Sequence, residues 1–222
     1  MRRVIVRLDD LGAMDRATMV LVEELCAAGL RLTCGVVPAW LTRACRDFLL
    51  GVSRRHPGQL EIHQHGYRHA NYGDEARKYE FDASRSDAQQ RAELERGRDA
   101  LAEAFGCIFW AAFSPPFGAY DLSVRQLTRE AGFLLLSGLY GDDDERVLPT
   151  VSPHVDVFRW DPVKPRSWSD IEYEWQTTPG PRIGGIVLHP RFTSASLAHI
   201  LVARLPALLE RCQTVTLQQV RE

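Results

Sequence analysis

Short apolar runs alternate with longer amphipathic segments along most of the chain. The runs have the length of β-strands, whereas the segments between them carry apolar residues at helical spacing. Strands that alternate with helices predict a mainly parallel sheet with helices packed on it, either as a barrel or as an open doubly wound sheet. We therefore expect an α/β fold in a single domain that spans residues 1–222.

The expected strands cover residues 4–6, 32–37, 59–64, 108–113, 133–137, 155–160, 185–188 and 214–217. The expected helices cover residues 14–28, 41–55, 86–105, 122–131 and 194–212. The third of these helices has the clearest ends, with Ser86 as its N-cap and Gly106 as its stop. Residues 66–85 form a long polar connection, and long loops on a compact domain are usually functional.

The composition argues against several classes of protein. A formal net charge of -2 gives no electrostatic reason to expect nucleic acid or an anionic membrane as a partner. The five cysteines are scattered and form no C-x-x-C pair, which indicates buried free thiols rather than disulfides or a structural zinc site. The apolar run near the N-terminus is too short for a signal peptide or a membrane span, so the sequence predicts a cytoplasmic protein.

Two adjacent carboxylates, Asp9 and Asp10, follow the first apolar run. In parallel α/β folds, ligands bind at the carboxyl ends of the strands, which is where this pair is expected to lie. Two carboxylates in a site of low dielectric repel each other, and a divalent cation would remove that repulsion. The alternative is that one acid caps the next helix while the other lies at the surface.

Three of the seven histidines lie within residues 63–69, directly after the third run. His65 and His69 are four residues apart, so on one helical turn they would project from the same face and share one zinc-class ion. The same spacing also occurs in exposed or hydrogen-bonded histidines, and only the position after a strand favours a metal site. We expect His63 to be a core or supporting residue.

One carboxylate and two histidines (Asp10, His65 and His69) form a ligand set that leaves positions open for water and substrate. The ion expected there is zinc, with cobalt, nickel, manganese and iron as alternatives. Such an ion lowers the pKa of its bound water to about 7. Asp9 is then placed to accept a proton from that water. His189 follows the strand at 185–188 and could protonate a departing amine; a histidine bonded to backbone is the alternative.

A rigid segment with two prolines follows the fourth strand. Its aromatic side chain, Phe117, suits stacking on the face of a sugar. The expected substrate-binding residues are Ser114, Pro116, Phe117 and Trp160. The alternatives are an ordinary turn with a packed phenylalanine and a tryptophan that belongs to the core.

Four motifs occur in a fixed order along the chain: Asp9-Asp10, His65-x-x-x-His69, Pro115-Pro116-Phe117-Gly118 and Leu188-His189. Together they resemble the polysaccharide deacetylase family, carbohydrate esterase family 4, over residues 8–190. The resemblance implies an irregular (β/α) barrel of about seven strands. It also implies a metal-dependent hydrolase that removes an N-acyl group, chiefly acetyl, from an amino sugar or a sugar-containing precursor.

The resemblance also implies a role for each residue of the site. Asp9 would be the catalytic base and His189 the general acid. The metal ligands would be Asp10, His65 and His69. Two further readings remain open: a non-catalytic saccharide-binding module with a residual metal site, and an Fe(II) enzyme with a 2-His-1-carboxylate centre. The second usually has a double-stranded β fold, which the alternating pattern does not favour.

The chain departs from the family pattern at Ser114, where the family carries an arginine that pairs with the base. Arg7 or Arg159 is the expected substitute for that cation. Residues 63–81 resemble a small bacterial branch linked with surface-polysaccharide and O-antigen synthesis, which implies a small sugar or a nucleotide- or lipid-linked substrate. In that branch Lys78 and Glu80 would face the site, although a solvated loop is the alternative.

Overall fold

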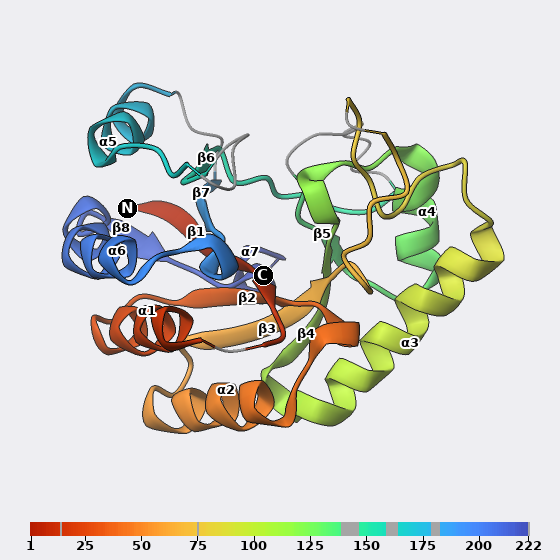
Figure 1. Cartoon of the computed structure of the whole chain (residues 1–222), viewed down its shortest axis with the longest axis horizontal. Helices are drawn as coiled ribbons and strands as arrows, with labels where there is room; N and C mark the ends of the chain where they lie inside the picture. The colour runs from red at the N-terminus through yellow and green to blue at the C-terminus, as the bar shows by residue number, and fades with distance from the viewer. Residues whose placement is uncertain (14, 75, 139–146, 159–163, 179–182, 222) are drawn as a thin grey trace.

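The sheet at the centre of the molecule is parallel throughout and strongly curled (Figure 1). The computed structural model describes residues 1–13, 15–74, 76–138, 147–158, 164–178 and 183–221. Its strands are β1 (Arg2–Leu11), β2 (Leu32–Val36), β3 (Leu60–His65), β4 (Phe109–Ser114), β5 (Leu135–Leu136), β6 (Val155–Asp156), β7 (Ile183–Leu188) and β8 (Cys212–Thr214). Seven strands follow the order β5-β4-β3-β2-β1-β7-β6, and β8 pairs with the start of β1.

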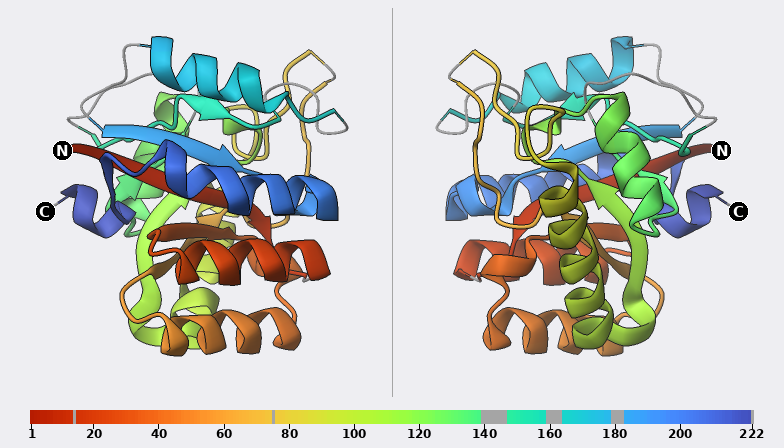
Figure 2. Two further views of the ribbon diagram at one scale, coloured as in Figure 1. Left: turned by 90° about the vertical axis from the view of Figure 1, so that its left-hand side faces the viewer. Right: turned by 90° about the vertical axis from the view of Figure 1, so that its right-hand side faces the viewer.

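Helices cover the outside of this curled sheet (Figure 2). They are α1 (Arg16–Ala27), α2 (Arg43–Arg55), α3 (Asp87–Phe105), α4 (Leu122–Glu130), α5 (Trp168–Thr177), α6 (Ala195–Leu208) and α7 (Leu217–Arg221). Neighbouring helices contact one another in the order α6, α1, α2, α3, α4. Short 3₁₀ turns lie at η1 (Pro38–Trp40), η2 (Gly106–Ile108), η3 (Pro116–Gly118) and η4 (Pro190–Phe192).

The alternation of side chains along β1 explains how one strand serves both the core and the site. Val4, Val6 and Leu8 belong to the large apolar cluster that packs under the helices. Successive residues of a strand point to opposite faces, so the residues between them point into the curl of the sheet. Ile5 joins a smaller inner cluster with residues of β4 and β5, whereas the inward positions nearer the carboxyl end hold Arg7 and Asp9.

One segment joins the two edges of the curled sheet. The N–H of Leu136 in β5 donates to the carbonyl of Pro149, and the N–H of Val151 donates back to Leu136. A few residues later, the N–H of His154 donates to the carbonyl of Gly185 in β7. Residues 149–157 therefore bond first to one edge and then to the other, so the expected irregular barrel of about seven strands is confirmed.

Several expectations near the C-terminus were wrong. Residues 214–217 do not form the last strand: β8 is Cys212–Thr214, set by its pairing with the start of β1, and α7 begins at Leu217. Helix α6 ends earlier than expected, at Leu208. Helix α5 was not expected, although Ser167 caps it with a side chain that accepts from Asp170 N and its buried residues lie at helical spacing.

The expectation of free cysteines is confirmed. All five have free thiols; Cys26, Cys34 and Cys45 are buried as expected, whereas Cys107 is exposed and Cys212 is half-buried. Burial raises the pKa of the Cys26 and Cys45 thiols to about 12, which leaves them protonated and unreactive at neutral pH. Within the described ranges, none of the helices has the length and apolar character needed to cross a bilayer.

Candidate metal centre

The carboxyl ends of β1 and β3 bring one carboxylate and two imidazoles together. The Nε2 atoms of His69 and His65 lie 2.9 and 3.4 Å from Oδ1 of Asp10. One potential ligand atom from each of these residues lies within 4.8 Å of the others. The three residues expected to hold a metal ion are therefore adjacent, although Asp10 is more than fifty positions from both histidines.

The chemistry of this donor set fits a zinc-class ion. Oδ1 of Asp10 is buried and, within the described part of the chain, makes no hydrogen bond, although two ring nitrogens face it. Burial alone would raise the pKa of Asp10, but the hydrogen bond from His189 and the ring nitrogens of His65 and His69 outweigh it and hold the pKa well below its usual value. An ionised oxygen and two imidazole nitrogens around one point are ligands that zinc prefers.

Backbone strain is concentrated at the same place. Among the described residues other than glycine, positive φ angles occur at Asp10 (63°), His69 (54°) and Phe117 (61°). Such conformations cost about 1–3 kcal/mol each and persist only where the surrounding structure imposes them. The helical turn expected between His65 and His69 was wrong: Gly66 and His69, both at positive φ, redirect the chain through a bend instead.

Asp9 lies beside this cluster and is held by a buried arginine. Its Oδ2 accepts a hydrogen bond of 2.8 Å from Arg7, and both side chains are almost fully buried. Arg7 also donates to the backbone carbonyl and the hydroxyl of Ser137, both at 2.7 Å. Arg7 is therefore the cation beside Asp9, whereas Arg159 lies outside the described residues.

The second oxygen of Asp9 is left available for chemistry. Burial alone would raise the pKa of Asp9, but the charges of Arg7 and the nearby histidines outweigh it, so the pKa is lowered and the carboxylate is ionised. Its Oδ1 has no hydrogen-bond partner among the described residues. A side chain at Gly35 of β2 would begin 3.0 Å from this oxygen and 3.1 Å from Nε2 of His63, so the glycine makes room for both.

His189 lies between two carboxylates at the end of β7. Its Nδ1 is 3.3 Å from Oδ2 of Asp10, and its Nε2 is 3.3 Å from Oδ2 of Asp156. Burial alone would lower the pKa of His189, but its hydrogen bonds to Asp10 and Asp156 raise it to about 10. Asp156 was not singled out from the sequence; its signal was an acid within the expected strand at 155–160.

Glu80 supports the turn that carries the histidines. Its carboxylate is buried and accepts from the backbone N–H groups of Tyr67, at 3.1 Å, and Arg68, at 2.6 Å. A Cβ on Gly66 would collide with Glu80 and with Pro116. Glu80 thus packs under the 66–69 bend. This differs from the expectation that it faces the open site. Lys78 is exposed.

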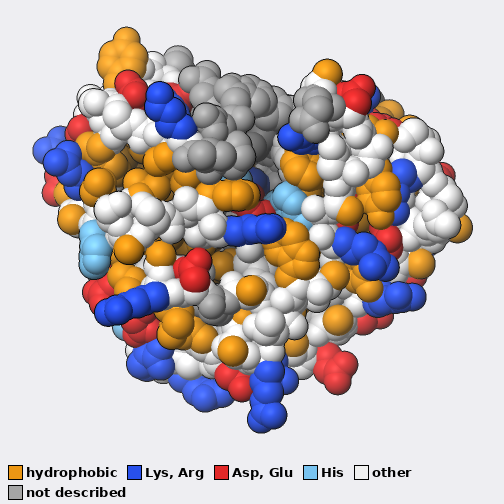
Figure 3. All heavy atoms as spheres, in the orientation of Figure 1, with side chains coloured by type: hydrophobic (Ala, Val, Ile, Leu, Met, Phe, Trp, Pro, Cys, Tyr) orange, Lys and Arg blue, Asp and Glu red, His pale blue; other side chains and the backbone are white. Residues whose placement is uncertain are grey.

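Aromatic rings flank His69, the more exposed of the two histidines that face Asp10. The ring centroid of His69 is 4.7 Å from that of Phe117 and 5.3 Å from that of Trp40. The guanidinium of Arg191 lies over Trp40 at 4.6 Å. Figure 3 shows histidine and acidic atoms together near the centre of this face, next to hydrophobic and cationic side chains. Trp40 was not predicted as a site residue, because it falls in a short turn without a motif.

Ser114 and Pro116, which were also expected to contact substrate, are buried. Ser114 is fully buried, and its hydroxyl is 2.8 Å from Nδ1 of His65 and 3.0 Å from Nε2 of His63. Pro116 is buried against Gly66. Trp160 lies outside the described residues. Burial lowers the pKa of His63 to about 3, so this ring is neutral.

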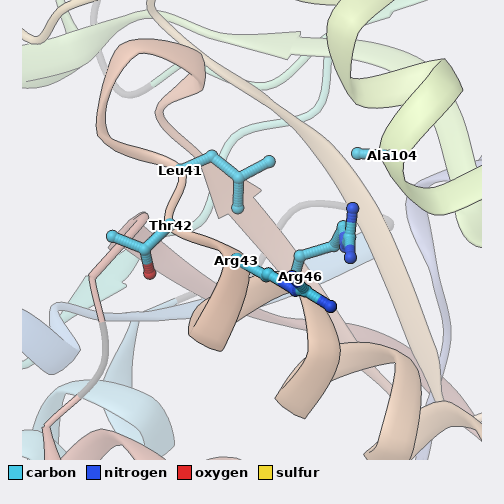
Figure 4. A pocket seen from close by; sticks show the side chains of 5 residues that line it. All are labelled: Leu41, Thr42, Arg43, Arg46 and Ala104. Carbon is cyan, nitrogen blue, oxygen red and sulfur yellow. The ribbon is translucent and has the colours of Figure 1, made fainter.

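A surface pocket of about 320 Å³ lies elsewhere, between the start of α2 and the end of α3 (Figure 4). Its lining residues are Leu41, Thr42, Arg43, Arg46 and Ala104. None of these five is a member of the cluster described above. The candidate site is therefore defined by convergent side chains and not by this pocket.

The model of one known protein family matches much of the chain. A family model described as polysaccharide deacetylase matches residues 16–136. This range contains His65, His69 and Ser114, but it begins after Asp10 and ends before His189. The positions of those two residues come from the structure alone. A search of curated proteins found no match.

Solved structures share the fold at low sequence identity. A family 4 carbohydrate esterase from Streptomyces lividans, in complex with acetate, is 17% identical with a TM-score of 0.64, over 96% of this chain and 91% of that one. A family 4 acetyl xylan esterase from Clostridium thermocellum, with a cobalt ion, is 15% identical with a TM-score of 0.66, over 99% and 90%. A family 4 pseudoenzyme from Bacillus anthracis is 15% identical with a TM-score of 0.66, over 100% and 66%.

Proposed function

The chain belongs to the polysaccharide deacetylase family, and on that basis we propose that it is a metal-dependent hydrolase that removes an N-acetyl group from an amino sugar. The observation that carries the proposal is the convergence of Asp10, His65 and His69 beside two further ionisable groups, Asp9 and His189. A base and an acid beside an open ligand set are what hydrolysis of an amide requires.

Asp10, His65 and His69 would hold one divalent ion, with zinc as the first candidate. When bound, such an ion polarises a carbonyl oxygen and lowers the pKa of a coordinated water. The chain offers the three ligands on rigid elements: Asp10 and His65 at strand ends, and His69 on the bend that Glu80 supports. Their buried, ionised carboxylate provides the negative charge that a cation needs.

Asp9 would act as the general base. Its lowered pKa keeps it ionised at neutral pH, and Arg7 holds one of its oxygens while the other remains able to accept a proton. His189 would act as the general acid, because its raised pKa keeps a proton available for the departing amine. In the resting state Asp9 is deprotonated and His189 is protonated, as their roles as base and acid require.

The rings beside His69 support a sugar as the substrate. Trp40 and Phe117 present aromatic surface next to the ligand set, and aromatic faces bury the apolar side of a sugar ring. We propose an acetamido sugar, either free or as part of a nucleotide- or lipid-linked precursor.

The test combines metal analysis with an acetate-release assay. Purified protein is expected to contain about one divalent ion per chain and to release acetate from at least one acetamido sugar in a screen of free, nucleotide-linked and lipid-linked forms. Asp10→Ala should lose both properties, whereas Asp47→Ala, at an exposed position of α2, should keep both. Bound metal without acetate release from any substrate would favour a non-catalytic sugar-binding protein, and a chain that binds no metal would refute the proposal.

A further inference from the structure

We propose that Ser114 is a positioning residue that sets the proton on His65, as the last link of a buried hydrogen-bond chain that begins at Glu61. The chain runs through five side chains: Glu61, Thr33, His63, Ser114 and His65. This inference rests on the proposed role of His65 as a metal ligand. It assigns a purpose to polar groups inside the barrel that the proposed reaction does not use.

The geometry of the chain is continuous. The Thr33 hydroxyl is 3.0 Å from Oε1 of Glu61 and 3.1 Å from Nδ1 of His63. The Ser114 hydroxyl is 3.0 Å from Nε2 of His63 and 2.8 Å from Nδ1 of His65. All five side chains are at most 5% exposed, so water does not compete for these bonds.

The strand register explains why these side chains meet. Thr33 of β2 is paired with Glu61 of β3, and Ser114 of β4 is paired with His65 of β3. Glu61, His63 and His65 alternate along one strand and therefore point to the same face, into the curl of the sheet. The hydrogen-bond chain thus crosses three neighbouring strands on the inner face of the barrel.

Glu61 gives the chain its direction. Its carboxylate accepts from Thr33 and from the backbone N–H groups of Leu217 and Gln218 at the start of α7, so both oxygens act as acceptors. The Thr33 hydroxyl, having donated to Glu61, can only accept from Nδ1–H of His63. The other end of the chain gives the same order. A metal ion on Nε2 of His65 would leave the proton of that ring on Nδ1, where it donates to the Ser114 oxygen, and the Ser114 hydroxyl then donates to Nε2 of His63.

The proton on the last ring, His65, lies on Nδ1 for the same reason. The Ser114 oxygen, having donated its proton to His63, accepts from Nδ1–H of His65. In the loaded protein, the lone pair of His65 Nε2 would then point at the ion that Asp10 also holds, and this is the form of the ring that a metal ion needs. An arginine at position 114 could not do this, because it has only donors. Arg7 supplies the cation beside Asp9 from another strand, which leaves position 114 to a hydroxyl.

The first test is nitrogen NMR of the zinc-loaded protein. Nδ1 of His63 and Nδ1 of His65 should both carry a proton, and Nε2 of His63 should carry none. In Thr33→Val, His63 loses the hydroxyl that accepts from its Nδ1–H. The proton of His63 should then move from Nδ1 to Nε2 and bond to the Ser114 oxygen. A His63 proton on Nε2 in the wild type, or one that stays on Nδ1 in Thr33→Val, would overturn the proposal.

The second test is zinc affinity, measured by competition with a chelator. Ser114→Ala is expected to weaken the Kd by about 10- to 100-fold, the usual cost of losing the partner of a ligand histidine. Thr33→Val should weaken it less, in the same direction. Thr128→Val is the control, because it removes a buried hydroxyl that donates to the Val124 carbonyl of its own helix α4, and it should bind zinc as wild type does.

The two proposals fail in different ways. If the wild-type protein binds zinc and Ser114→Ala binds it equally well, the hydrogen-bond chain has no effect on the ligand and this inference is wrong. If the wild-type protein binds no metal, the proposed function is wrong and this inference fails with it.

Discussion

At the scale of single residues, the site depends on charges that are buried in pairs. Arg7 and Asp9 form an ion pair inside the barrel, and His189 is held between Asp10 and Asp156. Removing one partner of a buried pair leaves an uncompensated charge, which typically costs about 3–5 kcal/mol. Substitutions that keep the shape of a side chain at these positions but remove its charge therefore test both chemistry and stability.

Asp9→Asn is expected to keep the metal and to lose turnover. The amide retains the shape of the carboxylate but cannot accept a proton from water, so kcat should fall by about 10²- to 10⁴-fold. The Arg7 charge becomes unpaired, so the midpoint of unfolding should also fall. Metal content by emission spectroscopy, kcat from acetate release and a denaturant titration measure the three effects. Wild-type kcat in this variant would show that Asp9 is not the base.

Asp156→Asn is expected to move the alkaline limb of the pH–rate profile to lower pH. His189 must be protonated to act as an acid, so activity is lost as pH rises through its pKa. Hydrogen bonds to Asp10 and Asp156 raise that pKa from 6.5 to about 10. Loss of the Asp156 charge lowers it, and the limb should follow. The measurement is kcat against pH for both proteins, and coincident limbs would mean that Asp156 does not act on His189.

At the scale of elements, the strand ends and the turns after them orient the ligands. His65 ends β3 and His69 follows a bend that depends on positive φ at Gly66 and on the buried carboxylate of Glu80. The bend is packed so tightly that a Cβ on Gly66 would collide with both Glu80 and Pro116. The direction of the second imidazole is therefore decided by the contacts of this turn.

Gly66→Ala is expected to weaken metal binding strongly, because the bend must shift to admit a methyl group. The control is Gly58→Ala: Gly58 also has positive φ, at 75°, but nothing lies within 4 Å of the position of its Cβ. Both variants place a Cβ at positive φ, which costs about 1–2 kcal/mol, so only the loss of metal affinity distinguishes them. Zinc titrations of both variants measure it, and equal affinities would show that the packing of the bend does not control the site.

At the scale of the whole molecule, sheet topology brings the ends of the chain together. β1 and β7 are neighbours, with Leu8 paired to Leu188, so Asp9 and His189 come next to each other at the same edge. The 149–157 segment joins the outer strands and places Asp156 beside His189. The proposed metal ligands, base and acid thus belong to one folded unit, and binding of an ion should stabilise that unit.

Zinc is expected to raise the melting temperature of the metal-free protein. An ion that binds only the folded state at 100 times its Kd stabilises it by about 2.7 kcal/mol, which corresponds to about 5–10 °C for a chain of this size. Asp10→Ala should melt at the same temperature with and without zinc. Scanning calorimetry with and without a chelator measures the shift, and an equal shift in Asp10→Ala would place the ion elsewhere.

The sequence alone determined the fold class, most of the strands and helices and the three residues proposed as metal ligands, because side-chain periodicity and short motifs are local properties. It did not determine the bend at His69, the role of Asp156 or the contacts of Trp40, because these depend on which strands become neighbours and on how tightly their loops pack. Ser114 illustrates the difference. Its position in a motif suggested a contact with substrate, whereas the pairing of β3 with β4 buries it between two imidazoles.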